Sequence, residues 1–428
     1  MEYFKNLFKT FSYYKSNYKI YESIINKLPL NILNLKNKHN EKYIKFNKFE
    51  KIKIVFLIQY PYLWGTYDNL IKSCLKNPKF KVDLVIAPYV NSKYKLEKEY
   101  ITVNKNILLR SKINFKFYNN YFLEKNKPHV IFIQKPYFKS LPNNFSISKI
   151  ISLGIRVCYI QYGGDPQTQK KKNTFNMQKI FFSNVWCIFS RSIKNKELYK
   201  KNINNKKVYI IVTGNPKFDQ FFNDNNISKI LLKKIIKKKV LFWATGFYTE
   251  YLTEDKSCSF YYYRQIFKYI KENKNIFLIF KPHPKLWDSL NNFSNHKKNF
   301  YKNIIKEIRK NPNIFYDENI NYFDYFKITD YLISDQNSIL QSFLITKKPI
   351  IFLKQPTTLL NINSLDMKKY LYIANNIDQL KSFISDLNNN FDPLKNSRKK
   401  IFDQHFNFFD GNSAHRIEDA IIKKLSYN

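Results

Sequence analysis

The stretch Ile276-Phe277-Leu278-Ile279-Phe280-Lys281-Pro282-His283-Pro284 runs from five consecutive apolar residues into a basic turn. An apolar run this short, without polar alternation, is typical of a parallel strand that is covered on both faces. Two prolines follow, and because proline lacks a backbone donor, the strand must end near Lys281. Ligands of open α/β sheets bind at this carboxyl edge. We therefore predict that Lys281 and His283 face a cleft, against the simpler alternative of a solvated lysine and a structural histidine.

Similar apolar runs recur along both halves of the chain, separated by segments long enough for helices. The first series occupies residues 52–58, 82–86, 130–133, 156–160, 185–189 and 208–212, and the second occupies 240–244, 276–280, 331–334, 350–353 and 372–373. Strands that alternate with helices form parallel sheets covered by those helices. The pattern predicts an α/β fold with two facing sheets of the nucleotide-binding type and a cleft between them.

The runs also predict the domain boundaries. An acceptor-side α/β domain spans residues 51–225, a nucleotide-donor-binding α/β domain spans 226–395, and a C-terminal helical segment spans 396–428. Residues 1–50 form a basic, aromatic segment, in which the spacing of residues such as Phe4, Phe8, Phe11 and Tyr18 fits an amphipathic helix. That helix is either an anchor at a membrane surface or an element packed on the domain behind it.

Composition limits the partners. The 428 residues contain 74 Lys and Arg against 32 Asp and Glu, a formal net charge of +42. Such a surplus favours polyanions or an anionic membrane surface. Nucleic acid is the competing partner, but the chain has no zinc-finger spacing, glycine-arginine segment or recognisable single-strand-binding motif. We predict an anionic membrane surface and no nucleic acid.

The cysteines and the apolar segments bear on the compartment. Cys74, Cys158, Cys187 and Cys258 are too widely spaced for a Cys-x-x-Cys metal site, so we expect buried thiols in a reducing compartment. The start of the sequence lacks the apolar core of a signal peptide, and no run reaches the length that would span a bilayer. We expect a cytoplasmic protein, peripheral to the inner face of the cell membrane.

Two further loops of the second half have side chains suited to phosphate. Thr245 and Gly246 follow a predicted strand and supply a hydroxyl and a glycine whose backbone can approach a ligand closely. Asn337 and Ser338 precede a predicted helix, where they either bind a phosphate or simply cap the helix. Together with Lys281 and His283, these residues would line one carboxyl edge, as binding of a nucleotide diphosphate requires.

The same elements resemble the CDP-glycerol glycerophosphotransferase family, the teichoic acid and capsule polymerases of two-domain GT-B architecture. The resemblance is carried by residues 240–246, Lys281-Pro282-His283-Pro284, residues 329–338 with 348–352, and residues 410–417, in the family's order. It covers the second half of the chain well and the first half loosely. It implies a GT-B-like fold, that is, two facing Rossmann-type domains with parallel sheets and a cleft between them.

The resemblance also implies a reaction and a donor site. The enzyme would transfer glycerol phosphate, or a related polyol or sugar phosphate, from CDP-glycerol or a similar nucleotide-linked donor to a hydroxyl of a polysaccharide or polyprenyl-linked acceptor. Cations and backbone groups suffice for such a transfer, so we expect no metal and no other cofactor. The residues that the resemblance assigns to the donor are His283, Asp335 and Ser338, together with Asp410 and Gly411. Gln336 and Asn337 depart from the family, which usually has a tyrosine and a serine there.

A larger departure concerns the catalytic base. The family typically has a Trp-His-Gly turn in its first domain, whose histidine resembles a general base, whereas this chain reads Gln161-Tyr162-Gly163-Gly164-Asp165. A tyrosine with an ordinary pKa near 10 is a poor base at neutral pH. We therefore predict Asp165 as the base, with Tyr162 and His283 as the other catalytic candidates; the alternative is that Asp165 only caps a glycine turn. His129 precedes its strand and should lie at the opposite edge of the sheet.

Another enzyme class remains open at this point. A GT-B glycosyltransferase that uses a nucleotide sugar for capsule or lipopolysaccharide synthesis would hold its donor phosphates in the same way, and attack would occur at the anomeric carbon. The residues do not distinguish the donor base, the acceptor, a primase from a polymerase, or the oligomeric state.

Overall fold

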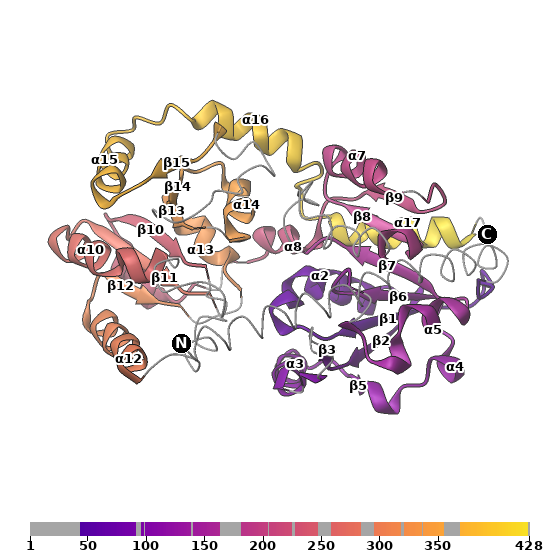
Figure 1. The fold of residues 1–428 in the computed structure, drawn as a ribbon. Coiled ribbons are helices and arrows are strands. Elements are labelled where there is room, and N and C mark those ends of the chain that lie inside the picture. The colour runs from indigo at the N-terminus through magenta and orange to yellow at the C-terminus, as the bar shows by residue number, and fades with distance from the viewer. Residues whose placement is uncertain are drawn as a thin grey trace, which may run out of the picture.

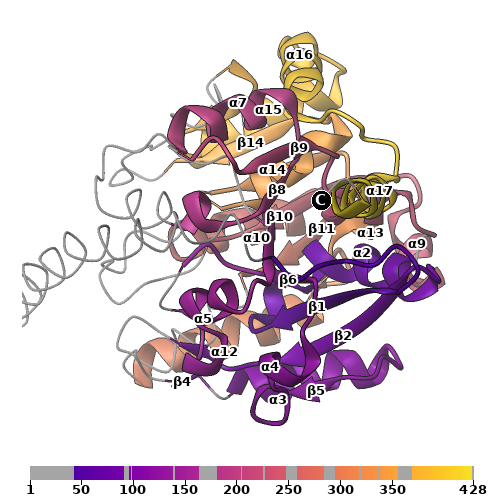
Figure 2. The same cartoon turned by 90° about the vertical axis from the view of Figure 1, so that its right-hand side faces the viewer.

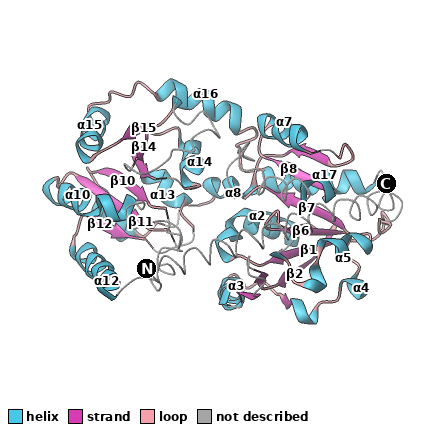
Figure 3. Cartoon of the chain, viewed as in Figure 1, coloured by secondary structure: helices cyan, strands magenta, loops and turns pink. Residues whose placement is uncertain are grey.

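The computed structural model describes residues 43–90, 96–97, 99–137, 140–162, 181–203, 205–224, 227–246, 258–283, 295–317, 321–335, 337–354 and 369–426. The chain forms two α/β lobes (Figure 1), in which helices surround the strands (Figure 3). The amphipathic helix predicted near the N-terminus falls within residues 1–42, outside the described part of the chain.

The first lobe contains a seven-stranded sheet in the order β5-β2-β1-β6-β7-β8-β9. Its described strand pairs are parallel, as predicted. The strands are β1 (Ile52–Ile58), β2 (Phe80–Ile86), β5 (Lys116–Phe117), β6 (Val130–Ile133), β7 (Arg156–Ile160), β8 (Cys187–Ser190) and β9 (Tyr209–Val212). An antiparallel pair, β3 (Tyr89–Val90) and β4 (Leu96–Glu97), and strand β5 were not predicted, because two residues are too few to show an apolar run.

Both faces of this sheet are covered, which explains the unbroken apolar runs. Along β1, Ile54 and Phe56 belong to one buried cluster, whereas Val55 and Leu57 belong to another. Successive side chains of a strand point to opposite faces, so a strand between two cores must be apolar at every position. The covering helices are α2 (Trp64–Lys76), α3 (Glu99–Arg110), α4 (Leu123–Asn126), α5 (Ile147–Ser152) and α7 (Ile193–Asn202).

The second lobe contains a six-stranded parallel sheet in the order β12-β11-β10-β13-β14-β15. All six residues of β11 are buried, and the strand ends at Lys281, as predicted from the two prolines. Its strands are β10 (Lys239–Ala244), β11 (Ile276–Lys281), β12 (Ile314–Tyr316), β13 (Tyr331–Ser334), β14 (Ile350–Leu353) and β15 (Tyr372–Ala374). The helices are α8 (Pro216–Asp219), which joins the lobes, α9 (Lys229–Ile235), α10 (Cys258–Glu272), α12 (Asn295–Lys310), α13 (Phe323–Ile328), α14 (Ile339–Phe343) and α15 (Ile377–Asn388).

The last helices divide between the two lobes. Helix α16 (Lys395–His405) places Ile401 and Phe402 in a core of the second lobe. Helix α17 (Ser413–Ser426) returns to the first lobe, where Ile417 and Ile421 enter its core (Figures 1 and 2). The segment predicted as helical, residues 396–428, thus corresponds to α16 and α17, which pack on different lobes.

The strand order locates the ligand-binding edge of each sheet. In the first sheet β1 lies between β2 and β6, and in the second β10 lies between β11 and β13. At such a point the connections leave the sheet toward opposite faces, and a crevice opens at the carboxyl ends of the strands. Both lobes have one such switch point.

Three of the four cysteines, Cys74, Cys158 and Cys187, are buried free thiols, as expected, and the burial of Cys258 is outside the description. Within the described ranges, no helix combines the length and apolar character needed to cross a bilayer.

Candidate active site

A cavity of about 660 Å³ lies between the carboxyl edges of the two sheets. Its walls come from loops that follow β1, β6 and β7 in the first lobe and β10, β11 and β13 in the second, with α8 between them. Polar and aromatic side chains contribute much of the lining, among them Tyr60, Tyr62, Trp64, Asp68, Arg110, Lys135, Tyr162, Lys217, Thr245, Lys281, His283, Tyr322, Asn337 and Ser338. The two switch points therefore open into one shared cavity.

Thr245 forms part of the second-lobe wall directly after β10. The residue is buried, and its hydroxyl has no hydrogen-bond partner among the described residues. Leaving a buried hydroxyl unpaired costs free energy. A bound ligand with acceptor oxygens, such as a phosphate, would remove that cost.

Lys281 lines the same wall, but its ammonium group has a structural contact. The Nζ atom lies 2.7 Å from Oδ2 of Asp317, whose side chain is fully buried. The other carboxylate oxygen of Asp317 accepts a 3.0 Å hydrogen bond from the Tyr325 hydroxyl. Sequence reasoning assigned Lys281 to a donor phosphate as a point charge; in the structure much of that charge is balanced within the second lobe.

His283 lies two residues beyond the end of β11 and also lines the cavity. Its side chain is half-buried. By contrast, His129 is buried at the opposite edge of the first sheet, where Nδ1 accepts a 2.9 Å hydrogen bond from the Lys53 amide and Nε2 lies 3.2 Å from Glu50. His129 therefore lies at the edge of the sheet away from the cavity, as its position before the strand predicted.

Asn337 and Ser338 both line the cavity, and their contacts separate the two roles predicted for them. The Asn337 amide donates to the Ala244 carbonyl and to the Ser334 hydroxyl, while its oxygen accepts from the Ile339 amide at 2.8 Å. Asn337 thus joins two loops of the wall and accepts a hydrogen bond from the first amide of α14, whose N-cap residue is Ser338. Ser338 is exposed, and its side chain makes no capping hydrogen bond. Its hydroxyl is therefore accessible to a ligand in the cavity.

Gly246 and Asp335 contact each other behind the wall and are not among the lining residues. The Gly246 amide donates to Oδ1 of Asp335, and a Cβ atom at position 246 would lie 3.0 Å from that oxygen. The contact fixes the loop after β10 against the loop after β13, and so positions the neighbouring Thr245. A direct contact of Asp335 with the donor stays a prediction from the resemblance.

Asp410 and Gly411 lie before α17 and are also absent from the described lining. Asp410 pairs with Arg416, and that hydrogen bond lowers the pKa of the Asp410 carboxyl. Gly411 has φ of +80°, and a Cβ atom there would lie 3.3 Å from the Phe222 side chain. Glycine is favoured at such a position. The structure places both residues in the turn that starts α17, so their role in donor binding remains a prediction.

Two predicted catalytic residues belong to the loop after β7. Tyr162 lines the cavity and is half-buried, and burial, reinforced by the neighbouring Tyr137, raises the pKa of its hydroxyl well above the ordinary value. The hydroxyl therefore stays protonated at neutral pH and can donate a hydrogen bond but not act as a base. Asp165 lies outside the described residues.

Sequence reasoning did not single out Asp68, which lies on α2. It is the one carboxylate among the described residues that line the cavity. Its Oδ2 atom pairs with Lys72 at 2.9 Å, whereas Oδ1 is buried with no hydrogen-bond partner in the described structure. Asp68 is therefore a second candidate for the base. The sequence could have indicated Asp68 through its place in the first helix after β1, next to the switch point.

The aromatic and basic residues of the first-lobe wall were also missed. Tyr60 and Lys135 each lie two residues beyond the end of a strand that was predicted correctly. The strand-end argument that found Lys281 could have found them. Lys217, on α8, was inaccessible to that argument, because its place depends on how the two lobes pack.

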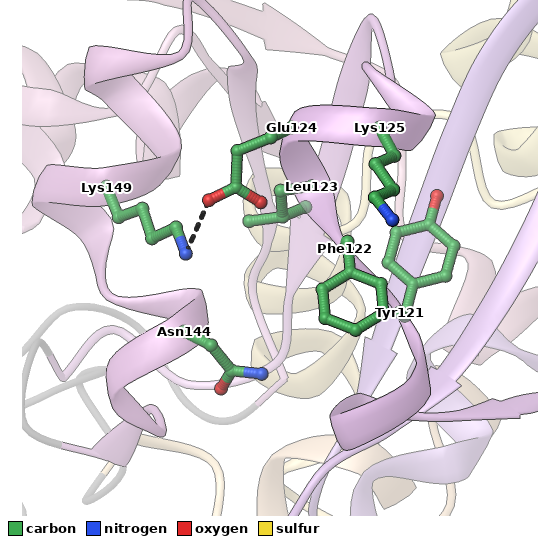
Figure 4. A pocket seen from close by; sticks show the side chains of 7 residues that line it. All are labelled: Tyr121, Phe122, Leu123, Glu124, Lys125, Asn144 and Lys149. Carbon is green, nitrogen blue, oxygen red and sulfur yellow. Dashed lines mark ion pairs between the residues drawn. The ribbon is translucent and has the colours of Figure 1, made fainter.

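A second, smaller cavity of about 340 Å³ lies around α4, and no residue of its lining belongs to the interlobe cavity (Figure 4). Its charged residues include Glu124 and Lys149, whose side chains pair at 2.7 Å. Within the described chain, no group of three or more His, Cys, Asp or Glu residues gathers in a way that could hold a metal ion. The interlobe cavity is the better candidate for the site, because residues from both switch points converge there.

Comparisons with known proteins agree with this geometry. The family model for CDP-glycerol:poly(glycerophosphate) glycerophosphotransferase matches residues 159–423. The teichoic acid ribitol-phosphate polymerase TarL of Staphylococcus aureus (strain NCTC 8325 / PS 47) is 25% identical over 230 residues, which cover 50% of this chain and 37% of that protein. The chain thus matches little more than a third of the length of that relative.

Two solved structures show the fold. A putative UDP-N-acetylglucosamine 2-epimerase from Listeria monocytogenes superposes with a TM-score of 0.61 at 14% identity, covering 88% of this chain and 98% of that one. A variant of the wall teichoic acid polymerase TagF soaked with CDPG gives a TM-score of 0.52 at 14% identity, covering 88% and 90%. The GT-B-like fold is confirmed by these likenesses and by the two parallel sheets. Since the family model spans more than half of the sequence, this chain belongs to the CDP-glycerol:poly(glycerophosphate) glycerophosphotransferase family.

Proposed function

We propose that this protein is a transferase that moves glycerol phosphate, or a related polyol phosphate, from a CDP-linked donor to a hydroxyl of a cell-surface polysaccharide or lipid-linked acceptor. The observation that carries the proposal is the convergence of two switch points on one cavity, with phosphate-competent side chains on the second-lobe wall. Membership of the family supports the choice of a CDP-linked donor.

In the proposed reaction, the acceptor oxygen attacks the donor phosphorus that bears the glycerol. A new P–O bond forms to the acceptor, the P–O bond to CMP breaks, and the acceptor proton passes to a base on the first-lobe side. Thr245, His283 and Ser338 would donate hydrogen bonds to the phosphates, and Lys217 would add positive charge from between the lobes. Positioned donors and cations of this kind are the main source of catalysis in phosphoryl transfer.

We also propose that the protein works at the cytoplasmic face of the membrane. The net charge of +42 supports this proposal, as does the surface of α9. Ile230 in this helix is 70% exposed, and Ile236, which follows the helix, is 63% exposed. Lysines of the same helix lie between them in the sequence. Exposed apolar side chains within a basic surface suit binding to anionic lipid headgroups.

The direct test incubates the purified protein with CDP-glycerol, CDP-ribitol and a panel of UDP-sugars, each with and without a lipid-linked acceptor, and measures the nucleotide released. Acceptor-dependent release of CMP from a CDP-linked donor supports the proposal. Release of UDP from a UDP-sugar, with no turnover of either CDP-linked donor, would contradict it and favour a nucleotide-sugar glycosyltransferase.

A further inference from the structure

The first-lobe wall of the cavity is unusually aromatic. Tyr60, Tyr62, Trp64 and Tyr162 all line it. The Tyr60 ring packs edge-on against Tyr62 and Tyr100, with centroids 5.4 Å and 4.9 Å apart. Rings in such T-shaped contacts hold one another in fixed orientations. Tyr60 and Trp64 are only 8% exposed, so the accessible aromatic surface comes from the partly exposed Tyr62 and Tyr162. The buried Tyr60 ring supports Tyr62 from behind.

A lysine is built into this aromatic wall. The Lys135 ammonium lies 3.6 Å from the centroid of Tyr60 and 4.2 Å from that of Tyr89, close enough for strong cation–π attraction. Lys135 also lines the cavity, at the carboxyl end of β6. Contact with ring faces does not cancel the formal charge of an ammonium group, so the wall combines aromatic surface with positive charge.

Buried amides make the wall rigid. The Gln134 side-chain oxygen accepts hydrogen bonds from the backbone amides of Gln59 and Tyr60, both at 2.8 Å. The Gln59 side chain in turn donates to the carbonyls of Pro88 and Ser140. These contacts tie the loop after β1 to the loops after β2 and β6. A binding surface that is fixed before the ligand arrives loses less entropy on binding.

The chemistry of this wall indicates what it binds. The flat aliphatic face of a pyranose ring packs well on an aromatic ring, whereas an open-chain polyol has no such face and must lose more torsional freedom to contact one. A lysine beside the ring suits a phosphate group. The donor phosphates have their own candidate residues on the opposite wall, so the first-lobe wall is available to the acceptor.

We propose that Tyr62 and Lys135, both positioned by the buried Tyr60 ring, form an acceptor subsite for a pyranose ring that carries a phosphate group. The inference rests on the proposed function, because it names the acceptor class of the same cavity. It means that the accepting hydroxyl lies on or next to a phosphorylated sugar, not within a chain of acyclic polyol phosphates alone.

The test compares two probes of equal charge and carbon-chain length, which differ in whether the sugar is closed into a ring. 1,5-Anhydroglucitol 6-phosphate is locked as a ring, and glucitol 6-phosphate is open. Binding of each to the full chain is measured by ligand-observed NMR, with no donor present. We expect the ring probe to bind at least about fivefold more tightly, which corresponds to about 1 kcal/mol.

Variants then locate the subsite. Tyr62→Ala should remove the preference for the ring, while Tyr62→Phe, which keeps the aromatic face, should retain it. Lys135→Met should weaken both probes by a similar factor, because both carry the phosphate. The matched controls are Phe122→Ala and Lys125→Met, which lie outside the interlobe cavity. Phe122 is 52% exposed, and the Lys125 ammonium lies 5.2 Å from the centroid of the Phe122 ring, so this pair repeats the aromatic and basic contact at another place. Neither control should change binding.

Three outcomes would overturn the inference. They are equal affinity for the two probes, a ring preference that survives in Tyr62→Ala, and loss of CMP binding, rather than probe binding, in Tyr62→Ala. The third outcome would assign the aromatic wall to the donor base. Release of CMP from CDP-glycerol and from CDP-ribitol is measured on the same preparations. A functional transferase without ring preference refutes only the subsite, whereas absence of CMP release from both donors refutes the proposed function.

Discussion

Lys281 and His283 lie only two residues apart, yet their surroundings give them different roles. Lys281 is held by a buried carboxylate, and His283 stands beyond the end of the strand on the cavity wall. The difference is local, because the first side chain still belongs to the sheet edge and the second to the turn. Substitutions at these two positions should therefore affect different properties.

Replacing His283 with alanine should nearly abolish transfer and leave the melting temperature close to that of the wild type. The reason is that the half-buried imidazole meets the cavity and contributes little to the core. His129→Ala is the matched control, because it removes a buried ring that accepts a hydrogen bond from the Lys53 amide. It should lower the melting temperature clearly and leave turnover, measured well below that temperature, close to the wild-type value. CMP release and thermal unfolding are measured on both variants. Parallel losses of stability and activity in His283→Ala would argue for a structural histidine.

Lys281→Met should destabilise the protein as well as weaken donor binding. Removing one partner of a buried ion pair leaves the other charge uncompensated, which costs about 3–5 kcal/mol. The double variant Lys281→Met with Asp317→Leu should recover part of that loss. Lys200→Met, which breaks the exposed pair with Glu197, should cost less than about 1 kcal/mol. Urea unfolding measures all of these, and an unchanged stability in Lys281→Met would show that the pair is not formed in solution.

The identity of the base is decided by three substitutions on the first-lobe side. Asp165→Asn should lower turnover by about 100-fold or more, the usual scale for a general base, with little change in donor affinity. Tyr162→Phe should be milder, because a tyrosine whose pKa is raised loses only a hydrogen bond.

Asp68→Asn provides the competing test, since Asp68 is the carboxylate that the described cavity wall contains. Steady-state kinetics and donor-binding measurements on the three variants separate the candidates. Near-normal turnover in Asp165→Asn, combined with a large loss of turnover in Asp68→Asn, would identify Asp68 on α2 as the general base.

At the scale of elements, α9 combines the charge of the chain with exposed apolar surface. Its sequence Lys229–Ile235 begins with a Ser228 cap that accepts from the Leu231 amide, and only Leu231 is buried in the helix. Ile235 packs partly against the core of the second lobe, whereas Ile230, the lysines of the helix and the following Ile236 are exposed to solvent. A helix of seven residues gains little stability from its own hydrogen bonds. Its exposed isoleucine and lysine side chains do not stabilise the helix, so we expect them to serve binding.

Ile230→Asp combined with Ile236→Asp should reduce binding to anionic vesicles and make the remainder more sensitive to salt. The apolar contribution would be lost, whereas the lysine contribution, about 1 kcal/mol for each residue near the surface, would remain and be screened by ions. The control is Phe391→Asp, which replaces a side chain that is 61% exposed beside Asp392 rather than among lysines. Co-sedimentation with vesicles of phosphatidylglycerol and of phosphatidylcholine gives the readout. Equal binding of the wild type to both lipids would count against a membrane role for the charge.

At the scale of the whole molecule, α17 ties the end of the chain to the first lobe. Asp219, on the helix between the lobes, accepts from the Ser413 hydroxyl at 2.7 Å and from the Ala414 amide at 3.0 Å. The carboxylate thus caps α17 and links it to the same joint that carries Lys217. Lys217 also reaches the second lobe, where Nζ lies 3.3 Å from the Ser342 hydroxyl.

This capping contact should give stability a measurable pH dependence. Burial raises the pKa of Asp219 above its ordinary value of 3.8, although its hydrogen bonds to Ser413 and Ala414 oppose the shift. The folded state therefore holds this proton more tightly than the unfolded chain, and stability falls as the pH rises from about 3.8 through the folded pKa.

The free energy of unfolding of the wild type, minus that of Asp219→Asn, should decrease over this range and then level off, because the variant cannot titrate there. Urea unfolding of both proteins at several pH values between 4 and 7 provides the comparison. A difference that grows with pH would mean that the hydrogen bonds outweigh burial.

Much of the fold was determined by the sequence itself. In strands such as β1, β6, β7, β11 and β13, the apolar run is the part of the chain covered on both faces, so composition alone marks the boundaries. The prolines after Lys281 fixed the end of β11 through a local property of the backbone. The sequence therefore predicted the longer strands, their parallel arrangement, and which side chains of the second lobe stand at a carboxyl edge. The short strands β3, β4, β5 and β12 were not predicted.

Only the tertiary structure decided which charges are neutralised and which residues meet across the cavity. Asp317, which pairs with Lys281, follows the end of β12 and lies 36 positions further along the chain. Asp68 reaches the cavity from within helix α2. Likewise, α17 packs on the first lobe although it follows the second in sequence. Such contacts depend on the packing of elements that are distant in the chain, and electrostatic pairing acts through space, so local periodicity and strand-end position carry no information about them.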